Sequence, residues 1–276
     1  MVELLGAGEI RSLASQLDLR PTKKLGQNFV IDPNTIRKIV TASQLQSTDK
    51  VVEIGPGLGS LTLGLLEKVD QLVAIEFDEK LATKLSETLR DKAPDKSAQI
   101  IHADAMTVAE LGFEPDALVA NLPYNISVPV ILHFLETFPS LSKVLVLVQA
   151  EVAARLVAGP GSKTYGSPSV KLAWYGKATA AGVVSRSIFW PVPNVDSALV
   201  YFEKRSTPLP AQLRAEVFRV IDGAFAQRRK TLRQALSSWA GSPYLAEQIL
   251  IKAGVSPQAR GEDLSVEDFI EVAKLK

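Results

Sequence analysis

Five short apolar runs lie between residues 51 and 148, and in none of them do apolar and polar residues alternate. The runs are Val51–Ile54, Leu72–Ile75, Gln99–His102, Ala117–Ala120 and Val144–Val148. Strands without such alternation are buried on both faces, which is typical of a parallel sheet with helices on either side. The pattern therefore predicts an α/β domain.

The segments between these runs are long enough for helices. They are Ser60–Val69, Asp78–Arg90 and Ser127–Phe138. Upstream, Asp32 followed by Pro33 predicts another helix start, because aspartate caps a helix and proline suits its first position. Strand-like sequence continues over Val170–Phe202, where Pro191 and Pro193 interrupt it, and we expect a terminal hairpin that closes the sheet.

The composition changes at residues 206–210, which read Ser-Thr-Pro-Leu-Pro, and the pattern beyond them is helical. Apolar residues repeat there with helical spacing, first at Val217, Val220, Ile221 and Ala224 and then at Leu232, Ala235, Leu236 and Trp239. Ser265 and Asp268 fit a capping box at the start of the last helix. We therefore predict an α/β domain with an N-terminal arm over residues 1–205 and a small all-helical domain over residues 208–276.

The composition excludes several classes of protein. The net charge is +1, from 31 basic and 30 acidic residues, so any contact with nucleic acid must come from a local basic patch. The chain has no cysteine and two histidines, which excludes disulfides, thiolate zinc sites and cysteine nucleophiles, and we expect no metal site. Neither a secretion signal nor an apolar stretch of about 18 residues is present, so we expect a cytoplasmic protein outside the membrane.

A glycine-rich turn follows the first apolar run. Gly55, Gly57 and Gly59 let the backbone turn tightly and approach a ligand. Their spacing does not match a dinucleotide site, and no Walker lysine follows, but it suits S-adenosylmethionine, whose amino-acid end carries no phosphate. Glu76 ends the next strand and can accept both ribose hydroxyl protons, while Asp104 can accept from the adenine amino group. The alternative is an ordinary turn with helix-capping acids, which the combination of three features disfavours.

The segment Asn121-Leu122-Pro123-Tyr124 follows the fourth run, at the strand end where chemistry takes place in this architecture. Its residues suit methylation of adenine N6, whose lone pair is delocalised into the ring. The Asn121 side-chain oxygen and a backbone carbonyl near Leu122 can accept both N6 hydrogens. Tyr124 offers an aromatic face to a base taken out of its stack. A Pro-Tyr turn with an asparagine cap is the alternative.

A second aromatic residue, Phe189, begins a loop that two prolines stiffen. Phe189 can therefore close the other face of the base, and a core position at a hairpin is the alternative.

Basic residues are concentrated over residues 204–233, a segment that contains eight basic and two acidic residues. On a helical wheel, Arg229, Lys230 and Arg233 share an arc beside the apolar stripe, so they can face a phosphate backbone. We predict RNA contacts from Lys23, Lys24, Arg228, Arg229, Lys230 and Arg233. A solvated helix face is the alternative.

Six segments resemble the ribosomal RNA small-subunit methyltransferase A family of adenine dimethyltransferases. They are Leu25–Phe29, Glu53–Gly59, Asn121–Ser127, Gln149–Leu156, Phe189–Ser197 and Phe225–Arg233. The asparagine at position 121 distinguishes this group from amino-methyltransferases that carry aspartate there. The last segment points to small-subunit enzymes more than to the large-subunit antibiotic-resistance methylases.

The resemblance implies a Rossmann-like class I methyltransferase fold with a seven-stranded sheet and a C-terminal helical domain. It implies transfer of four methyl groups from S-adenosylmethionine to two adjacent adenosines near the 3′ end of 16S rRNA in a small-subunit precursor, and we expect a monomer. By resemblance, the cofactor is lined by Asn28, Val30, Gly55, Glu76, Asp104 and Asn121, and the adenine is held by Asn121, Leu122, Tyr124 and Phe189. Val30 stands where leucine is more usual.

Two other functions stay open. One is methylation of an adenine in large-subunit rRNA. The other is a non-catalytic RNA-binding factor in ribosome assembly, although a scaffold has no need of the glycine turn, Glu76 and the Asn121–Tyr124 segment.

Overall fold

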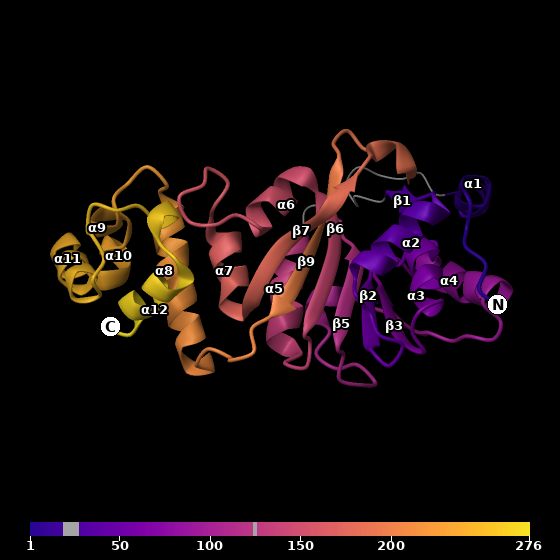
Figure 1. The fold of residues 1–276 in the computed structure, drawn as a ribbon, viewed down its shortest axis with the longest axis horizontal. Coiled ribbons are helices and arrows are strands. Elements are labelled where there is room, and N and C mark those ends of the chain that lie inside the picture. The colour runs from indigo at the N-terminus through magenta and orange to yellow at the C-terminus, as the bar shows by residue number, and fades with distance from the viewer. Residues whose placement is uncertain (19–27, 124–125) are drawn as a thin grey trace. The chain divides into compact units, whose positions relative to one another are not determined.

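The computed structural model describes residues 1–18, 28–123 and 126–276, and these form two compact units (Figure 1). The first unit comprises residues 1–153 and 179–203, and the second comprises residues 154–178 and 204–276. The second unit therefore includes a segment upstream of the predicted linker at residues 206–210. The predicted domain limits stay a prediction.

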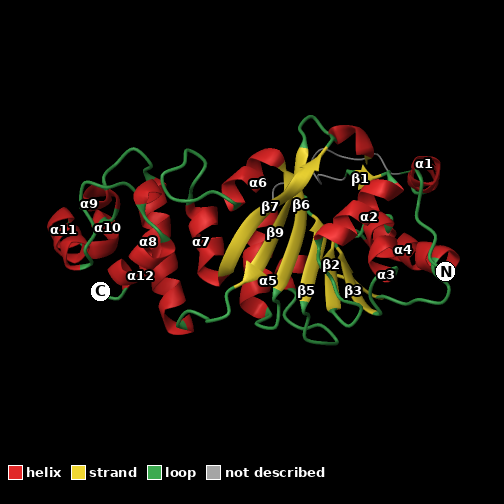
Figure 2. Cartoon of the chain, in the orientation of Figure 1, coloured by secondary structure: helices red, strands yellow, loops and turns green. Residues whose placement is uncertain are grey.

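A seven-stranded sheet forms the centre of the first unit, in the order β4-β3-β2-β5-β6-β9-β7 (Figure 2). The strands are β2 Lys50–Ile54, β3 Gln71–Glu76, β4 Gln99–His102, β5 Ala117–Asn121, β6 Lys143–Gln149, β7 Gly176–Val184 and β9 Ser197–Lys204. Strands β4, β3, β2, β5 and β6 are parallel, and β9 pairs antiparallel with β6. The α/β class and the seven-stranded sheet are confirmed.

The register of the central strands positions the site. Ile54 of β2 lies opposite Ala120 of β5, so the residues that follow them, Gly55 and Asn121, emerge side by side at the carboxyl edge of the sheet. The interiors of β2, β3, β5 and β6 are buried, as the apolar runs predict. A separate two-stranded sheet joins β1 Phe29–Val30 to β8 Phe189–Trp190.

In the first part of the chain, helix α1 precedes the first strand and the other helices lie between strands in sequence. They are α1 Ala7–Gln16, α2 Pro33–Ala42, α3 Ser60–Leu66, α4 Glu79–Lys92, α5 Ser127–Thr137 and α6 Ala150–Leu156. The predicted start at Asp32-Pro33 is confirmed, because Asp32 caps α2. Among the described residues, no helix is both long and apolar enough to cross a membrane.

The strand-like interpretation of Val170–Phe202 is wrong at its beginning, where Ser167–Tyr175 forms helix α7. Pro168 lies in the first turn of α7, and the Ser169 hydroxyl accepts a hydrogen bond from Gly166 N at 3.1 Å. A short buried apolar run does not distinguish a helix from a strand by periodicity, so these start signals decide.

The second unit is helical apart from the ends of β7 and β9. Besides α7 it contains α8 Arg214–Ala226, α9 Leu232–Ala235, α10 Ser237–Ala240, α11 Pro243–Lys252 and α12 Val266–Ala273. The predicted apolar stripe of α8 is buried. The predicted capping box is present, because Ser265 and Asp268 each accept a hydrogen bond from the backbone N–H of the other.

The cap of α2 gives a test of stability. Asp32 Oδ2 accepts hydrogen bonds from the Thr35 hydroxyl at 2.6 Å and from Thr35 N at 2.9 Å, and the Thr35 hydroxyl is the main reason why the Asp32 pKa lies below its ordinary value. Replacing Asp32 with alanine should lower the free energy of unfolding by about 1 kcal/mol at pH 7, as measured by urea denaturation.

The variant D32N is the matched control, because asparagine also caps helices but does not titrate. A lowered folded-state pKa stabilises the fold above the unfolded-state value and loses this effect as the pH falls. The advantage of the wild-type chain over D32N should therefore be constant above the ordinary value of 3.8 and shrink as the pH falls below it. Equal stability of D32A and the wild-type chain would contradict the cap.

Candidate active site and RNA interface

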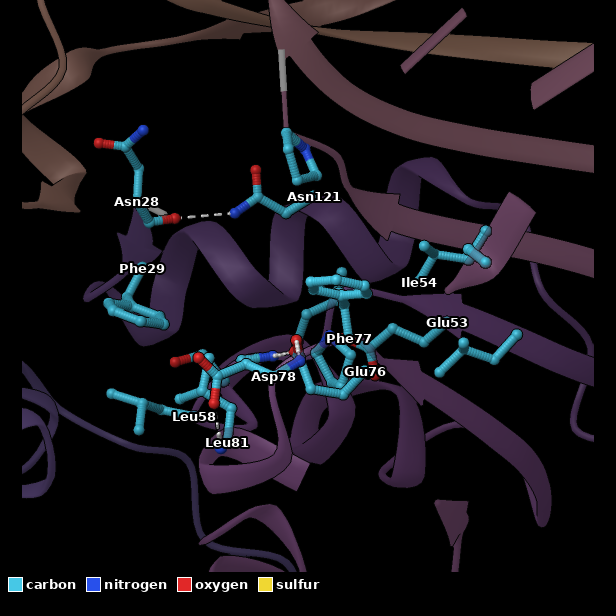
Figure 3. A pocket seen from close by; sticks show the side chains of 18 of the residues that line it. Asn28, Phe29, Glu53, Ile54, Leu58, Glu76, Phe77, Asp78, Leu81 and Asn121 are labelled. Atoms are coloured by element: carbon cyan, nitrogen blue, oxygen red, sulfur yellow. Dashed lines mark hydrogen bonds between the residues drawn. The ribbon is translucent and has the colours of Figure 1, made fainter. Parts of the chain in front are cut away.

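A cavity of about 280 Å³ lies at the carboxyl ends of β2, β3, β4 and β5 (Figure 3). Its walls include every residue that the sequence assigned to the cofactor, namely Asn28, Val30, Gly55, Gly57, Glu76, Asp104 and Asn121. Parallel strands bring residues that are distant in sequence to one edge of the sheet, where ligands of open α/β folds bind.

The glycine turn after β2 has a backbone that other residues rarely adopt. Gly55, Gly57 and Gly59 have φ angles of 69°, 58° and 97°. A β-carbon at Gly57 would lie 2.9 Å from the Phe29 ring, which itself lines the cavity. Glycine is therefore required at position 57 both by conformation and by the approach of Phe29. The turn offers a ligand backbone without obstructing side chains.

Glu76 connects this turn to the start of α4. Its side chain is 6% exposed, and its carboxylate accepts hydrogen bonds from Gly57 N and from Asp78 N, each at 3.0 Å. Burial raises the pKa of Glu76, although both backbone N–H groups act in the opposite direction. Each carboxylate oxygen has a further lone pair, so the group can still accept from ribose hydroxyls in the cavity.

Glu53 is a lining residue that the sequence did not assign. It is 1% exposed, and its Oε2 has no hydrogen-bond partner among the described residues. Burial raises the Glu53 pKa to about 8, and the neighbouring charge of Glu76 contributes to the rise. The sequence signal for a special role of Glu53 was its position inside the apolar run Val51–Ile54, where an unpaired charge is unfavourable.

Asn121 ends β5 and turns its amide toward the N-terminal strand. Its Nδ2 donates a hydrogen bond to the backbone carbonyl of Asn28 at 3.0 Å (Figure 3). The contact fixes the amide plane, so Oδ1 is the acceptor that the side chain can offer to a ligand. Leu122 follows with its side chain buried and its backbone N–H bonded to Leu147 O at 3.1 Å.

Of the two aromatic residues that the sequence assigns to the adenine, Tyr124 lies outside the described residues. Phe189 is 1% exposed and packs in the hydrophobic core, where β8 pairs with β1, and it is not among the residues that line the cavity. Apolar burial beside Val30 explains this position, which is the core alternative that the sequence left open, and the predicted contact of Phe189 with a base stays a prediction.

Phe77 is a further lining residue that the sequence analysis did not single out. Its side chain is 65% exposed although it is large and aromatic. It follows Glu76 directly, at the end of β3. An exposed aromatic residue after a strand-end acid was the available signal, because such a ring can stack on a purine.

The predicted RNA-contacting cations of the second unit do not share one helix face. Helix α8 ends at Ala226, and Arg228, Arg229 and Lys230 lie in the turns before α9, which corrects the helical-wheel prediction. Arg228 pairs with Glu262, whereas Arg233 pairs with Glu247. Arg229 and Lys230 are exposed and lack a side-chain partner among the described residues. Lys23 and Lys24 lie outside the described residues.

Solved structures share this fold. A dimethyladenosine transferase from Plasmodium falciparum has a TM-score of 0.74 and 23% identity, covering 87% of this chain and 94% of that one. The 23S rRNA methyltransferase ErmE has a TM-score of 0.67 and 26% identity, covering 90% and 98%. The sheet, the glycine turn and the strand-end acid together define a class I methyltransferase that uses S-adenosylmethionine.

Sequence comparisons give the family. A family model described as ribosomal RNA adenine dimethylase matches residues 19–276. The ribosomal RNA small subunit methyltransferase A of Streptomyces coelicolor is 57% identical over 99% of this chain and 97% of its own length. The protein of the same name from Kineococcus radiotolerans is also 57% identical, over 98% and 91%. The chain belongs to the ribosomal RNA adenine dimethylase family.

The glycine turn gives a binding test. Replacing Gly57 with alanine places a β-carbon against Phe29 at a positive φ, so the dissociation constant for S-adenosylmethionine should rise by about tenfold or more in calorimetric titration. The variant G8A is the control, since a β-carbon there would meet no atom of another part of the fold within 4 Å. Tight binding by a folded G57A would contradict the role of the turn.

The buried Glu53 gives a pH test. Between its ordinary pKa of 4.5 and about 8, the unfolded chain has lost the Glu53 proton while the folded chain keeps it, so the fold loses stability as the pH rises. The variant E53Q should not show this decrease. Between pH 5 and 8 its free energy of unfolding should rise, relative to that of the wild-type chain, by on the order of a few kcal/mol. Denaturation profiles measure this, with exposed Glu67→Gln as control, and parallel profiles would contradict it.

Proposed function

We propose that this chain transfers methyl groups from S-adenosylmethionine to N6 of two adjacent adenosines in a hairpin near the 3′ end of 16S rRNA. The substrate is a small ribosomal subunit precursor, and the protein acts in the cytoplasm as a monomer. Family membership and the relatives named for the small subunit support this proposal.

The observation that carries the proposal is the Asn121 amide. The hydrogen bond from its Nδ2 to Asn28 O leaves Oδ1 as an acceptor beside a cavity whose glycine turn and Glu76 suit the donor. Adenine N6 is a poor nucleophile because its lone pair is delocalised into the ring. An acceptor that holds an N6 hydrogen draws the nitrogen toward tetrahedral geometry and localises this lone pair.

The residues present fit the donor. Gly55 and Gly57 leave room for its amino-acid end, Glu76 would accept from the ribose hydroxyls, and Asp104 would accept from the adenine amino group. When bound, S-adenosylmethionine supplies an electrophilic methyl group on a sulfonium. Asp104 Oδ1 also accepts from Met106 N at 2.9 Å, which orients the carboxylate.

The chain contributes alignment more than acid–base chemistry. Asn121 Oδ1 would hold one N6 hydrogen and the Leu122 carbonyl the other, with Tyr124 against the face of the base. Holding two reactants in line contributes several kcal/mol to rate enhancement. The methylated nitrogen then loses its proton readily, so a strong general base is not required.

The small-subunit substrate has one specific competitor. The likeness to a 23S rRNA methyltransferase at 26% identity favours large-subunit rRNA as the second candidate. Incubating the protein with labelled S-adenosylmethionine and immature small or large subunits, and then locating the labelled nucleotides, decides between them. Label on the large subunit would overturn the proposed substrate, and failure to bind the donor would favour a non-catalytic assembly factor.

Asn121 gives the catalytic test. Replacing it with alanine removes the acceptor, so methylation of immature small subunits should fall by about a hundredfold or more, while RNA binding stays within a few-fold. The control is N34A, at an exposed asparagine in the first turn of α2. Near-normal turnover by N121A would refute the role of the amide.

The exposed turn after α8 gives a binding test. Each phosphate contact releases counterions, so the affinity for rRNA should fall steeply with salt. Replacing Arg229 and Lys230 with glutamine should lower the slope of log affinity against log salt by about 1 to 2. The variant K68Q, in the turn after α3, is the control. A wild-type affinity that is flat in salt would contradict this surface.

A further inference from the structure

A single guanidinium anchors the loop over residues 157–166, which precedes α7 in the second unit (Figure 1). The Arg228 Nη2 donates hydrogen bonds to the carbonyl of Lys163 at 3.0 Å and to the carbonyl of Tyr165 at 3.1 Å. The same nitrogen lies 3.3 Å from the Glu262 carboxylate. Arg228 thus joins this loop to the segment before α12.

Two further contacts hold the loop against the same segment. Gly161 N donates to the backbone carbonyl of Glu262 at 2.8 Å. The buried Tyr165 hydroxyl donates to Leu264 O at 2.9 Å, and the Tyr165 ring packs edge-on against Phe225 of α8. The backbone on both sides of Lys163 therefore has a defined position within the second unit.

The side chain of Lys163 is left free by this arrangement. It is exposed, and it has no hydrogen-bond or ion-pair partner among the described residues. Because Arg228 holds its backbone, Lys163 lies beside the turn that carries the exposed cations Arg229 and Lys230. The Arg228 charge is offset by Glu262, whereas the other three charges are not offset by a described ion pair.

We propose that Lys163 binds the rRNA phosphate backbone together with Arg229 and Lys230, and that Arg228 is a positioning residue that holds the Lys163 loop against their turn. The inference rests on the proposed rRNA substrate. A lysine on a flexible stem binds phosphate as a point charge, so its contribution is independent of base sequence and sensitive to salt. A guanidinium bonded to two carbonyls and beside a carboxylate suits a fixed structural role.

The test compares the salt dependence of binding to immature small subunits for four proteins: wild type, K163Q, R228Q and the double variant. Loss of one phosphate contact makes the slope of log affinity against log salt less steep by about 0.7 to 0.9. Both single variants should show this decrease, and the double variant should show no more than either, because R228Q acts through Lys163. The control T164A, at an exposed residue of the same loop, should keep the wild-type slope.

If the change in slope in the double variant equals the sum of the changes in the two single variants, Arg228 contacts RNA itself, and this overturns the positioning role. An unchanged slope in K163Q with a steep wild-type slope overturns this inference alone. A wild-type affinity without salt dependence overturns the proposed rRNA surface as well.

A second measurement needs no RNA. Hydrogen exchange of the amides over residues 157–166 should become faster in R228Q, because the two carbonyl contacts are lost, and should be unchanged in K163Q. R228K should restore the exchange rates only in part, since an ammonium does not reproduce the guanidinium fork. Equal exchange in R228Q and the wild-type chain would overturn the anchoring of the loop.

Discussion

The parallel pairing of β2 with β5 is the constraint on which the site depends. Its register sets Ile54 against Ala120, and the next residue of each strand then belongs to the cavity. One strand delivers the glycine turn and the other delivers Asn121. A shift of this register by one residue would turn the side chain of Asn121 to the other face of the sheet. The glycine turn and Asn121 are therefore brought to one cavity by the backbone hydrogen bonds of the sheet.

Two buried carboxyls have different roles beside this pairing. Glu76 is satisfied by the backbone of the glycine turn and by the start of α4, so it fixes the shape of the cavity. Glu53 has an oxygen without a partner among the described residues, and its raised pKa keeps it neutral near pH 7. Burial disfavours the charged form of a carboxyl group, so the neutral form costs less at this position. Glu76 thus holds the glycine turn in place, whereas Glu53 leaves a polar oxygen in the wall of the cavity without a partner among the described residues.

Most of the fold could be predicted from the sequence because its strands carry a strong signal. The five apolar runs correspond to β2 to β6, and the Asp32-Pro33 start was also predictable from local chemistry. Helix α7 was not, because its apolar run is as long as a strand. The burial of Phe189 in the core could not be predicted either. It depends on the pairing of β8 with β1, two segments that are distant in sequence and have no periodic pattern.

The candidate site was predictable where a motif is local, as for the glycine turn, Glu76 and Asn121. Arg228 was not, because a basic run shows which residues are charged and not which of them meet a carbonyl or an acid. Its contacts come from Lys163, Tyr165 and Glu262, which lie more than 30 positions away in either direction. Glu53 was overlooked because one acidic residue hardly changes an apolar run.

The hydrogen bond between Asn121 and Asn28 has a consequence for synthesis of the chain. Asn28 adjoins β1, whose pairing partner β8 ends at Trp190, and Trp190 stacks on Phe29 at 6.4 Å. The segment that orients the amide is therefore paired with a strand about 160 positions further along the chain, near residue 190 of 276. A polypeptide that has not yet been extended through Trp190 cannot form this pairing, so the support of the amide depends on the last third of the chain.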